Sequence, residues 1–417
     1  MKQRDSTRPT TDDSHRVPRK ALQNDDLSHR PSMNRIKALN ASRCSRFALQ
    51  HLRARRIRYS TFRLPAMHFA SDNWAGAHPT IAASLTEHAN GYSQPYSDSE
   101  LDKTVEKRFG EIFERDVAVF YVATGTAANS LALSLVGKPG GIALAHRDAH
   151  LVADECGAPE YLSGGQLRLA TVDGPEGKID AKLLRKKVES MAGENVHAGR
   201  TNAISITQST EAGTIYSLDE IDAIASVARD YNLPLHMDGA RFANALVSLG
   251  CTPAEMTWKR GVDMLSFGAT KNGCWCAEAV VLFDKTKLHA ENFPYIRKRA
   301  AQLFSKSRFI SAQFEAYLRD GLWLELARHA NGMAAKLAES IIASKSARLV
   351  GSPRANEVFV VLSTSFISMA KEKGAVFYNP WPVPKDLEIT DDEQLCRFVT
   401  SFSTTEEDIK QLTELLQ

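Results

Sequence analysis

Two polar residues stand where apolar runs of the sequence end. Asp238 follows Leu235-His236-Met237, and Arg241 comes three residues later. Lys271 follows the apolar run 264–269, 33 positions beyond Asp238, and its neighbours carry no charge. A buried carboxylate is costly unless a cation pairs with it, and a lysine in a confined site can lose its proton and form a Schiff base. A ring with a cationic nitrogen would pair with Asp238. Arg241 could then reach a phenolate oxygen of the same ring.

A short turn of small residues adds a third chemical group. Thr124-Gly125-Thr126 stands between a β-rich run and a Leu/Ala-rich run, and at such a helix start the backbone N–H groups and the helix dipole favour a phosphate. A phosphate turn, a Schiff-base lysine and an acid for a ring nitrogen together describe a site for pyridoxal 5'-phosphate. For Asp238 and Arg241 alone, a salt bridge between the two is an equally good interpretation.

Alternating strands and helices are expected to position these groups. The sequence predicts strands at 118–122, 142–146, 203–207, 235–238, 263–267 and 279–283, and helices at 99–115, 126–136, 218–231 and 240–249. Ser217 and Glu220 have the spacing of a capping box at the start of the third helix. Apolar strands separated by helices are typical of an α/β fold with a mostly parallel sheet covered on both faces. Asp238 and Lys271, about one βαβ unit apart, then converge at neighbouring strand ends.

The sequence predicts three parts. Residues 1–66 form a basic extension that is expected to be disordered, residues 67–300 a large cofactor-binding domain, and residues 301–417 a small C-terminal α/β domain. The last part is predicted from a helical stretch at 308–344, strands around 357–362, a proline-rich loop and a helix at 405–416.

The net charge of +3 hides an uneven distribution. Residues 1–66 hold 16 Lys and Arg against 5 acidic residues, a charge of +11, and the remainder carries −8. The segment lacks the interleaved aromatic residues that would support a nucleic-acid-binding arm. Its five acidic residues argue against a mitochondrial transit peptide. The favoured interpretation is an accessory extension or a misassigned start before Met67. No nucleic-acid partner is expected for the catalytic part.

The cysteines and the hydropathy do not indicate a disulfide-stabilised, metal-binding or membrane-spanning protein. The six cysteines have no C-x-x-C spacing and build no disulfide framework, so a reducing cytoplasmic compartment is expected. Cys274 and Cys276 lack further ligands nearby, so no metal site is expected. The uncharged run 117–137 is interrupted by polar residues and predicts a strand, a turn and a buried helix rather than a membrane span.

The motifs together resemble one known family. They resemble the threonine aldolase group of fold type I pyridoxal-phosphate enzymes, also called the β-eliminating lyase family, over roughly residues 67–417. The positions that carry the resemblance are Ser71-Asp72-Asn73, Thr124-Gly125-Thr126 with Asn129, His150 followed by Glu155 and Gly157, the run 236–241, and the region of Lys271.

The resemblance implies cofactor roles for six residues. Lys271 would hold pyridoxal phosphate as a Schiff base, Asp238 would keep its ring nitrogen protonated, and Arg241 would lie beside its phenolate oxygen. The phosphate would bind at Gly125 and Thr126. His150 would stack on the ring close to the substrate hydroxyl, either as the catalytic base or only to orient the ring.

The substrate residues follow from the same resemblance. Ser71 and Arg308 match positions that hold the substrate carboxylate, and Tyr96 matches a tyrosine that is often lent to a neighbouring subunit. The segment 207–213 lacks an arginine that the family has there, so the carboxylate rests on Arg308 alone or is shared with Arg397. The usual Tyr-Gly pair is Tyr96-Ser97 here.

The resemblance implies a lyase that cleaves L-threonine, L-allo-threonine or a related β-hydroxy-α-amino acid at Cα–Cβ into glycine and an aldehyde, with Lys271, His150 and Asp238 as catalytic residues. A homodimer or homotetramer is implied, with an amino acid as the small-molecule partner and no membrane partner. Two alternatives stay open: another fold type I enzyme, such as a β-eliminating lyase of the tryptophanase kind or an aminotransferase, and a cofactor-binding scaffold whose basic arm binds nucleic acid.

Overall fold

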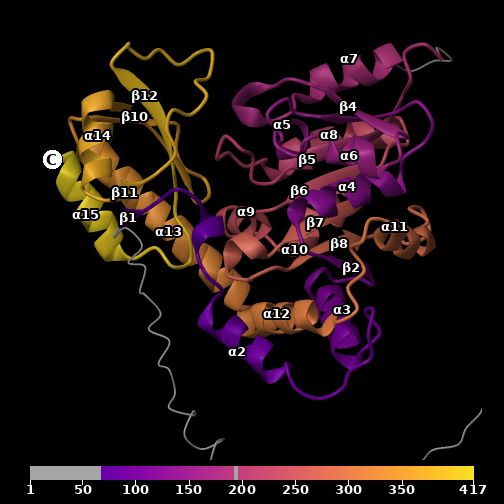
Figure 1. The fold of residues 1–417 in the computed structure, drawn as a ribbon. Helices are drawn as coiled ribbons and strands as arrows, with labels where there is room; N and C mark the ends of the chain where they lie inside the picture. The colour runs from indigo at the N-terminus through magenta and orange to yellow at the C-terminus, as the bar shows by residue number, and fades with distance from the viewer. Residues whose placement is uncertain (1–66, 192–195) are drawn as a thin grey trace, which may run out of the picture. The chain divides into compact units, whose positions relative to one another are not determined.

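A seven-stranded sheet organises the first part of the molecule (Figure 1). The computed structural model describes residues 67–191 and 196–417, and the predicted extension 1–66 lies outside them. The strand order is β2-β8-β7-β6-β5-β3-β4, in which only β8 runs against its neighbours. The mostly parallel α/β sheet is therefore confirmed. Its strands are β2 (Ala118–Val122), β3 (Gly141–Ala145), β4 (Leu167–Thr171), β5 (Arg200–Thr207), β6 (Leu235–Gly239), β7 (Met264–Gly268) and β8 (Glu278–Leu282).

Helices connect these strands and cover both faces of the sheet. They are α2 (Pro79–Glu87), α3 (Glu100–Ile112), α4 (Gly125–Leu135), α5 (His150–Ala153), α6 (Ala158–Leu162), α7 (Ala181–Met191), α8 (Leu218–Asp230), α9 (Phe242–Leu249), α10 (Pro253–Met256), α11 (Phe293–Arg299) and α12 (Arg308–Leu318). The predicted capping box of Ser217 and Glu220 is present at the start of α8.

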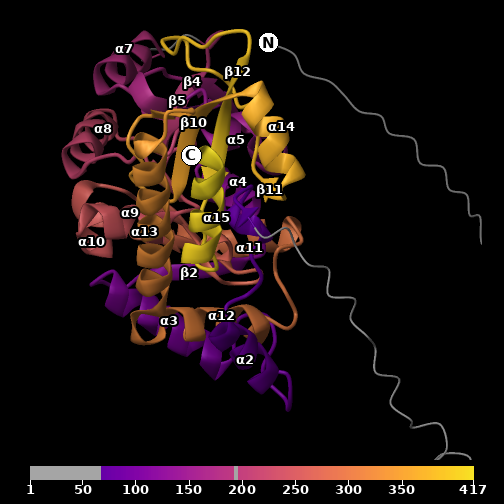
Figure 2. The same ribbon diagram turned by 90° about the vertical axis from the view of Figure 1, so that its left-hand side faces the viewer.

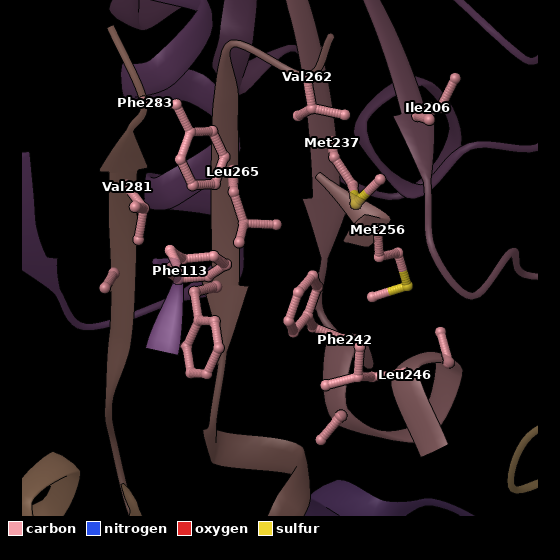
Figure 3. Packing of buried hydrophobic residues seen from close by; sticks show 14 of the residues in the cluster. Phe113, Ile206, Met237, Phe242, Leu246, Met256, Val262, Leu265, Val281 and Phe283 are labelled. Atoms are coloured by element: carbon pink, nitrogen blue, oxygen red, sulfur yellow. The ribbon is translucent and has the colours of Figure 1, made fainter. Parts of the chain in front are cut away.

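Alternate residues of the central strands face two different cores. On one face, Met237 of β6 and Leu265 of β7 pack with Phe113 and Phe242 (Figure 3). On the other face, Met264 lies in a second apolar cluster with α4. The uncharged run 117–137 forms β2 and α4, as predicted, and within the described ranges no helix is long and apolar enough to cross a membrane.

A three-stranded antiparallel sheet organises the C-terminal part, in the order β12 (Glu393–Val399), β10 (Glu357–Ser363) and β9 (Ala347–Val350). It is flanked by α13 (Leu322–Ala343), α14 (Thr364–Glu372) and α15 (Glu406–Leu416), and α13 contacts α15 (Figure 2). The predicted helical stretch 308–344 is broken between α12 and α13, because Asp320 and Gly321 have left-handed backbone with φ of 52° and 77°.

The N-terminal strand β1 (Met67–His68) pairs in parallel with β11 (Ala375–Val376). The first described residues thus join the C-terminal part before the chain enters the large sheet. Each of the ranges 67–300 and 301–417 contains a sheet of its own, and the division into two domains at residue 300 stays a prediction.

Strand direction brings several chain segments to one edge of the large sheet. Val122 of β2 and Gly268 of β7 are both in register with Glu278, and Gly239 of β6 is in register with Phe267. Because β2, β3, β6 and β7 run in the same direction, the turns that follow them all emerge at this edge. These turns carry Gly125, His150, Arg241 and Lys271.

A buried histidine forms hydrogen bonds to both neighbouring strands in the middle of the sheet. His236 of β6 is completely buried, and its Nδ1 and Nε2 each lie 2.9 Å from a serine hydroxyl, Ser205 of β5 and Ser266 of β7. Burial lowers the pKa of His236 to about 4. The imidazole is therefore neutral at neutral pH and bonds to both neighbouring strands.

His236 predicts a specific loss of stability in mild acid. Its folded-state pKa lies below that of an unfolded histidine, so the unfolded chain binds the proton first and stability falls as the pH drops from about 6.5 toward 4. Between pH 7.5 and 5 this amounts to about 2 kcal/mol. In urea unfolding, the advantage of wild type over His236→Gln should shrink by about that amount. A pH-independent difference would contradict the assignment.

Candidate active site

Asp238 ends β6 as a buried carboxylate held by two neutral donors. Its Oδ2 accepts a hydrogen bond from Asn129 Nδ2 of α4 at 2.8 Å, and its Oδ1 accepts one from the backbone N–H of Ala240 at 3.0 Å. The side chain is 3% exposed. No ion pair joins it to any cation in the ranges 67–191 and 196–417, which leaves a negative charge at the edge of the sheet.

Arg241 pairs with other acids, so the salt bridge between Asp238 and Arg241 that was open as an alternative is wrong. Its Nε and Nη2 donate to Asp72 Oδ2 and Oδ1 at 2.8 and 3.1 Å, and its Nη1 lies 3.5 Å from Glu357 Oε1. The fork geometry of the guanidinium matches the two oxygens of Asp72. Burial acts to raise the pKa of Asp72, but the charges of Arg241 and Lys271 hold it below its usual range.

Glu357 joins a second arginine to this pair. Its Oε1 lies 3.4 Å from Arg397 Nη1, and the Arg397 guanidinium lies over the ring of Trp381 at 4.0 Å. Burial raises the pKa of Glu357 to about 7, against the charges of Arg241 and Arg397. Asp72, Arg241, Glu357 and Arg397 form a cluster of two acids and two bases, here called the buried charge cluster.

Lys271 stands in a short 3-10 turn (Thr270–Asn272) that follows β7. The turn is anchored by Asn272, whose Nδ2 donates to Tyr317 Oη at 2.7 Å and to the Trp323 carbonyl at 2.8 Å. The side chain of Lys271 has neither a hydrogen bond nor an ion pair to another described residue. Gly273 then leaves the turn with φ of 106°, and a Cβ there would meet Leu326 Cδ1 at 2.9 Å. The backbone is thus fixed around an amine without a partner.

The charge of Lys271 nevertheless acts on several site residues. Burial raises the pKa of Glu278 to about 7, and the charge of Lys271 opposes that shift. The pKa of His150 is raised by its hydrogen bond to Glu155, and both burial and the charge of Lys271 oppose this. Together with its effect on Asp72, these interactions place Lys271 among the residues at the strand ends.

The turn at Thr124 leaves backbone donors available. Thr124 caps α4 by accepting from the N–H of Ala127 at 3.1 Å. The N–H groups of Gly125 and Thr126 have no acceptor among the described residues. No heavy atom lies within 4 Å of the position that a Cβ on Gly125 would occupy. Free donors beside open space at a helix start suit a phosphate group.

His150 begins α5 and belongs to the same site through hydrogen bonds. Its Nδ1 lies 2.9 Å from Glu155 Oε1, and that oxygen also accepts from Asn129 Nδ2 at 2.9 Å. Since Asn129 also donates to Asp238, four side chains are linked in sequence. We call His150, Glu155, Asn129 and Asp238 the Asn129 network.

The three predicted substrate residues have separate locations. Ser71 caps the turn Asp72–Trp74, which contacts the turn of Lys271. Tyr96 is 49% exposed, and the ammonium of Lys298 lies 5.4 Å from its ring centroid. Arg308 donates to the carbonyls of Gly91 and Asn90 at 3.0 and 3.4 Å. Among the described contacts, none links Tyr96 or Arg308 to Asp238 or Lys271.

Two buried acids of the site were not predicted from the sequence. Glu357 and Glu278 are each the first residue of a strand whose remaining residues are mostly apolar. The signal was present, because an acid next to an apolar run resembles Asp238 at the end of β6. Neither acid stands at a position that carried the family resemblance.

Buried polar atoms without partners test whether pyridoxal phosphate fits here. Asn129 Oδ1, Thr207 Oγ1 and Ser209 Oγ are buried without a hydrogen bond, and Thr207 is in register with Asp238. Buried polar atoms are normally satisfied, so unpaired atoms around Asp238 suit a polar ligand. With the unpartnered Lys271 and the free donors at Gly125, the residues present fit the cofactor.

Comparisons with known proteins identify the family to which the chain belongs. Residues 68–365 match the family described as Beta-eliminating lyase. The chain is 40% identical over 311 residues to a low specificity L-threonine aldolase of Pseudomonas sp. (strain NCIMB 10558), covering 75% of this chain and 88% of that protein. The corresponding Pseudomonas aeruginosa protein is 39% identical with the same coverage.

Solved structures give the same picture. The threonine aldolase of Leishmania major superimposes with a TM-score of 0.77 at 27% identity, covering 84% of this chain and 98% of that one. A putative L-allo-threonine aldolase of Listeria monocytogenes has a TM-score of 0.63 at 16% identity, covering 84% and 96%, and shows the fold alone.

The buried charge cluster predicts a large effect of removing Asp72. Asp72→Asn deprives Arg241 of its bidentate partner and leaves it with the more distant Glu357 at 3.5 Å, and breaking a buried ion pair costs about 3 kcal/mol of unfolding free energy. Urea unfolding measures this loss. As the matched control, Glu111→Gln breaks a pair with Arg108 in which both side chains are about half exposed, and it should cost less than about 1 kcal/mol. Equal losses in the two variants would contradict the prediction.

Proposed function

Because the chain belongs to the β-eliminating lyase family, we propose that it is a pyridoxal-phosphate-dependent threonine aldolase. It cleaves L-threonine, L-allo-threonine or a related β-hydroxy-α-amino acid into glycine and an aldehyde. One observation carries the proposal: Lys271 and Asp238, which have no ion-pair partner among the described residues, stand at the carboxyl ends of adjacent parallel strands in a chain 40% identical to a low specificity L-threonine aldolase.

The cofactor residues follow from their surroundings. Among the described residues the side chain of Lys271 has no ion-pair partner, so it is free to form a Schiff base. Asp238 would pair with the ring nitrogen, because its hydrogen-bond partners Asn129 and Ala240 are neutral. Gly125 and Thr126 offer N–H groups to the phosphate. When bound, pyridoxal phosphate supplies an electron sink for the electron pair of the broken Cα–Cβ bond.

His150 is proposed to accept the proton of the substrate β-hydroxyl. Its side chain is 33% exposed, and the hydrogen bond to Glu155 raises its pKa, which favours the protonated form that follows proton uptake. The same residue would stack on the ring, and a role limited to stacking is the alternative for His150.

Three arginines are proposed to act near the ring and the substrate carboxylate. Arg241 would lie beside the phenolate oxygen. Arg397 is the favoured carboxylate ligand, because it shares Glu357 with Arg241 and its Nε is buried without a partner. Arg308, whose guanidinium is engaged by the carbonyls of Asn90 and Gly91, is the competing candidate. Ser71 would contribute its hydroxyl beside Asp72.

Assembly and compartment are also part of the proposal. A homodimer or homotetramer would let the exposed Tyr96 serve a neighbouring subunit's site. A cytoplasmic location is supported by the five cysteines of the described ranges, all of which are free.

Replacing Lys271 tests the central claim. Lys271→Ala should lose the visible absorbance of the lysine-bound cofactor and reduce turnover on the order of 10³-fold or more. Products are measured with a panel of β-hydroxy amino acids: glycine with an aldehyde supports the aldolase, and pyruvate with ammonia would indicate a β-eliminating lyase instead. A Lys271→Ala protein with unchanged absorbance and turnover would refute the scheme.

A pair of arginine variants separates the two carboxylate candidates. Arg397→Ala should raise KM for the amino acid on the order of 10- to 100-fold, because a charge-assisted hydrogen bond is lost. Arg308→Ala should change KM by less than about 3-fold. Both variants are compared with wild type by urea unfolding, so that a folding defect is recognised. The reverse order of KM values would assign the carboxylate to Arg308.

A further inference from the structure

The Asn129 network connects two residues that the proposed function places at different parts of the cofactor ring. Asp238 ends β6, Asn129 is in α4, His150 begins α5, and Glu155 lies between α5 and α6. The three contacts that link them measure 2.8, 2.9 and 2.9 Å. All four side chains therefore form one continuous set of hydrogen bonds.

We propose that Asn129 and Glu155 are positioning residues that hold the His150 proton on Nδ1 and present the free Nε2 to the substrate, while fixing the carboxylate of Asp238. This inference rests on the proposed function, because it concerns how His150 and Asp238 act in that reaction. Neither Asn129 nor Glu155 would itself contact the reacting atoms.

The orientation of the Asn129 amide follows from its two neighbours. A side-chain amide has two N–H donors on nitrogen and none on oxygen. Its nitrogen lies within 2.9 Å of both Glu155 Oε1 and Asp238 Oδ2. In the flipped orientation the amide oxygen would face both carboxylates without a hydrogen between them. Both N–H groups are therefore used, one on each acid.

The proton on His150 follows from that orientation. Glu155 Oε1 already accepts from Asn129, and an ionised carboxylate has no hydrogen to donate. The contact of 2.9 Å with His150 Nδ1 is then a hydrogen bond that the imidazole donates. A neutral imidazole with its proton on Nδ1 has its lone pair on Nε2. That nitrogen is the one available to take a proton from a substrate hydroxyl.

Burial argues against a purely structural role for Glu155. Its side chain is 0% exposed, and its Oε2 has no hydrogen-bond partner. A buried carboxylate is less favourable for stability than an apolar side chain of similar size. Cys156, which follows Glu155, also has a left-handed φ of 53°, a strained conformation for a residue with a Cβ. An apolar residue would fill this space at a lower cost in stability.

The groups around His150 act on its pKa in the direction that this arrangement predicts. The hydrogen bond to Glu155 is the largest influence and raises the pKa of His150, while burial and the charge of Lys271 lower it. The charges of Glu211 and Asp238 add to the raising effect. Without Glu155, His150 would lose the main interaction that favours its protonated form.

Two variants test the proposal, because they should shift the pKa of His150 in opposite directions. Glu155→Gln removes the negative charge, so the pKa of His150 should fall. Asn129→Ala removes a competing donor from Glu155, so the carboxylate should interact more strongly with His150 and its pKa should rise. A residue that only fills space would not produce shifts of opposite sign.

The shift is measured in the cofactor-free protein, so the result does not depend on turnover. Diethyl pyrocarbonate reacts with neutral imidazole, and the modified peptide is quantified by mass spectrometry as a function of pH. Glu160→Gln is the matched control, because Glu160 lies five residues from Glu155 and bonds to the N–H of Leu169 rather than to His150. Its His150 profile should match that of wild type.

Activity provides a second readout. With cofactor bound, Glu155→Gln should lower kcat/KM on the order of 10- to 100-fold and move the acid limb of its pH profile in the same direction as the modification profile. An unchanged His150 profile in a folded Glu155→Gln protein would overturn the proposal, as would shifts of the same sign in both variants. If Glu155→Gln does not fold, the upward shift in Asn129→Ala decides alone. Wild type that releases no glycine would refute the proposed function and leave the modification result standing.

Discussion

The common direction of β2, β3, β6 and β7 is the constraint on which the site depends. Each of these strands delivers a different chemical group at its carboxyl end: free N–H donors, an imidazole, a carboxylate and an amine. The groups are separated by up to about 150 positions in sequence and would not meet in a sheet with alternating directions. β8 lies between β2 and β7 and is antiparallel to both. β2 therefore runs in the same direction as β7, and its carboxyl end lies at the same edge of the sheet.

At this edge of the sheet, the ion pairs of Arg241 determine which partners remain for Asp238. Asp72 and Glu357 take up the positive charge of Arg241, and Asp238 is therefore left to neutral donors. The separation matters because an arginine bound directly to Asp238 would already pair with the carboxylate that we propose for a ring nitrogen. Asp72 comes from the N-terminal segment and Glu357 from the C-terminal sheet, so the state of Asp238 depends on residues far from it in sequence.

Local patterns were sufficient to predict six of the seven strands of the large sheet and the positions of Asp238, Lys271 and the turn at Thr124, whereas β4 (Leu167–Thr171) was not predicted. An apolar run with a polar end is a property of neighbouring residues, and so is the capping box at Ser217. The partners of Arg241 were not predictable in this way, because Asp72 is 169 and Glu357 116 positions away and no local pattern favours either over Asp238. The break between α12 and α13 was missed because helical periodicity continues on both sides of Asp320.

The pairing of β1 with β11 has a consequence for engineering the chain. Residues 67–74 add a strand beside Ala375 and Val376 and, a few residues later, supply Asp72 to the Arg241 guanidinium. One short segment therefore contacts both the C-terminal part, through β11, and the turn after β6, through Arg241. A truncation that starts after His68 removes this strand, and one that starts after Asp72 also removes the bidentate counterion of Arg241.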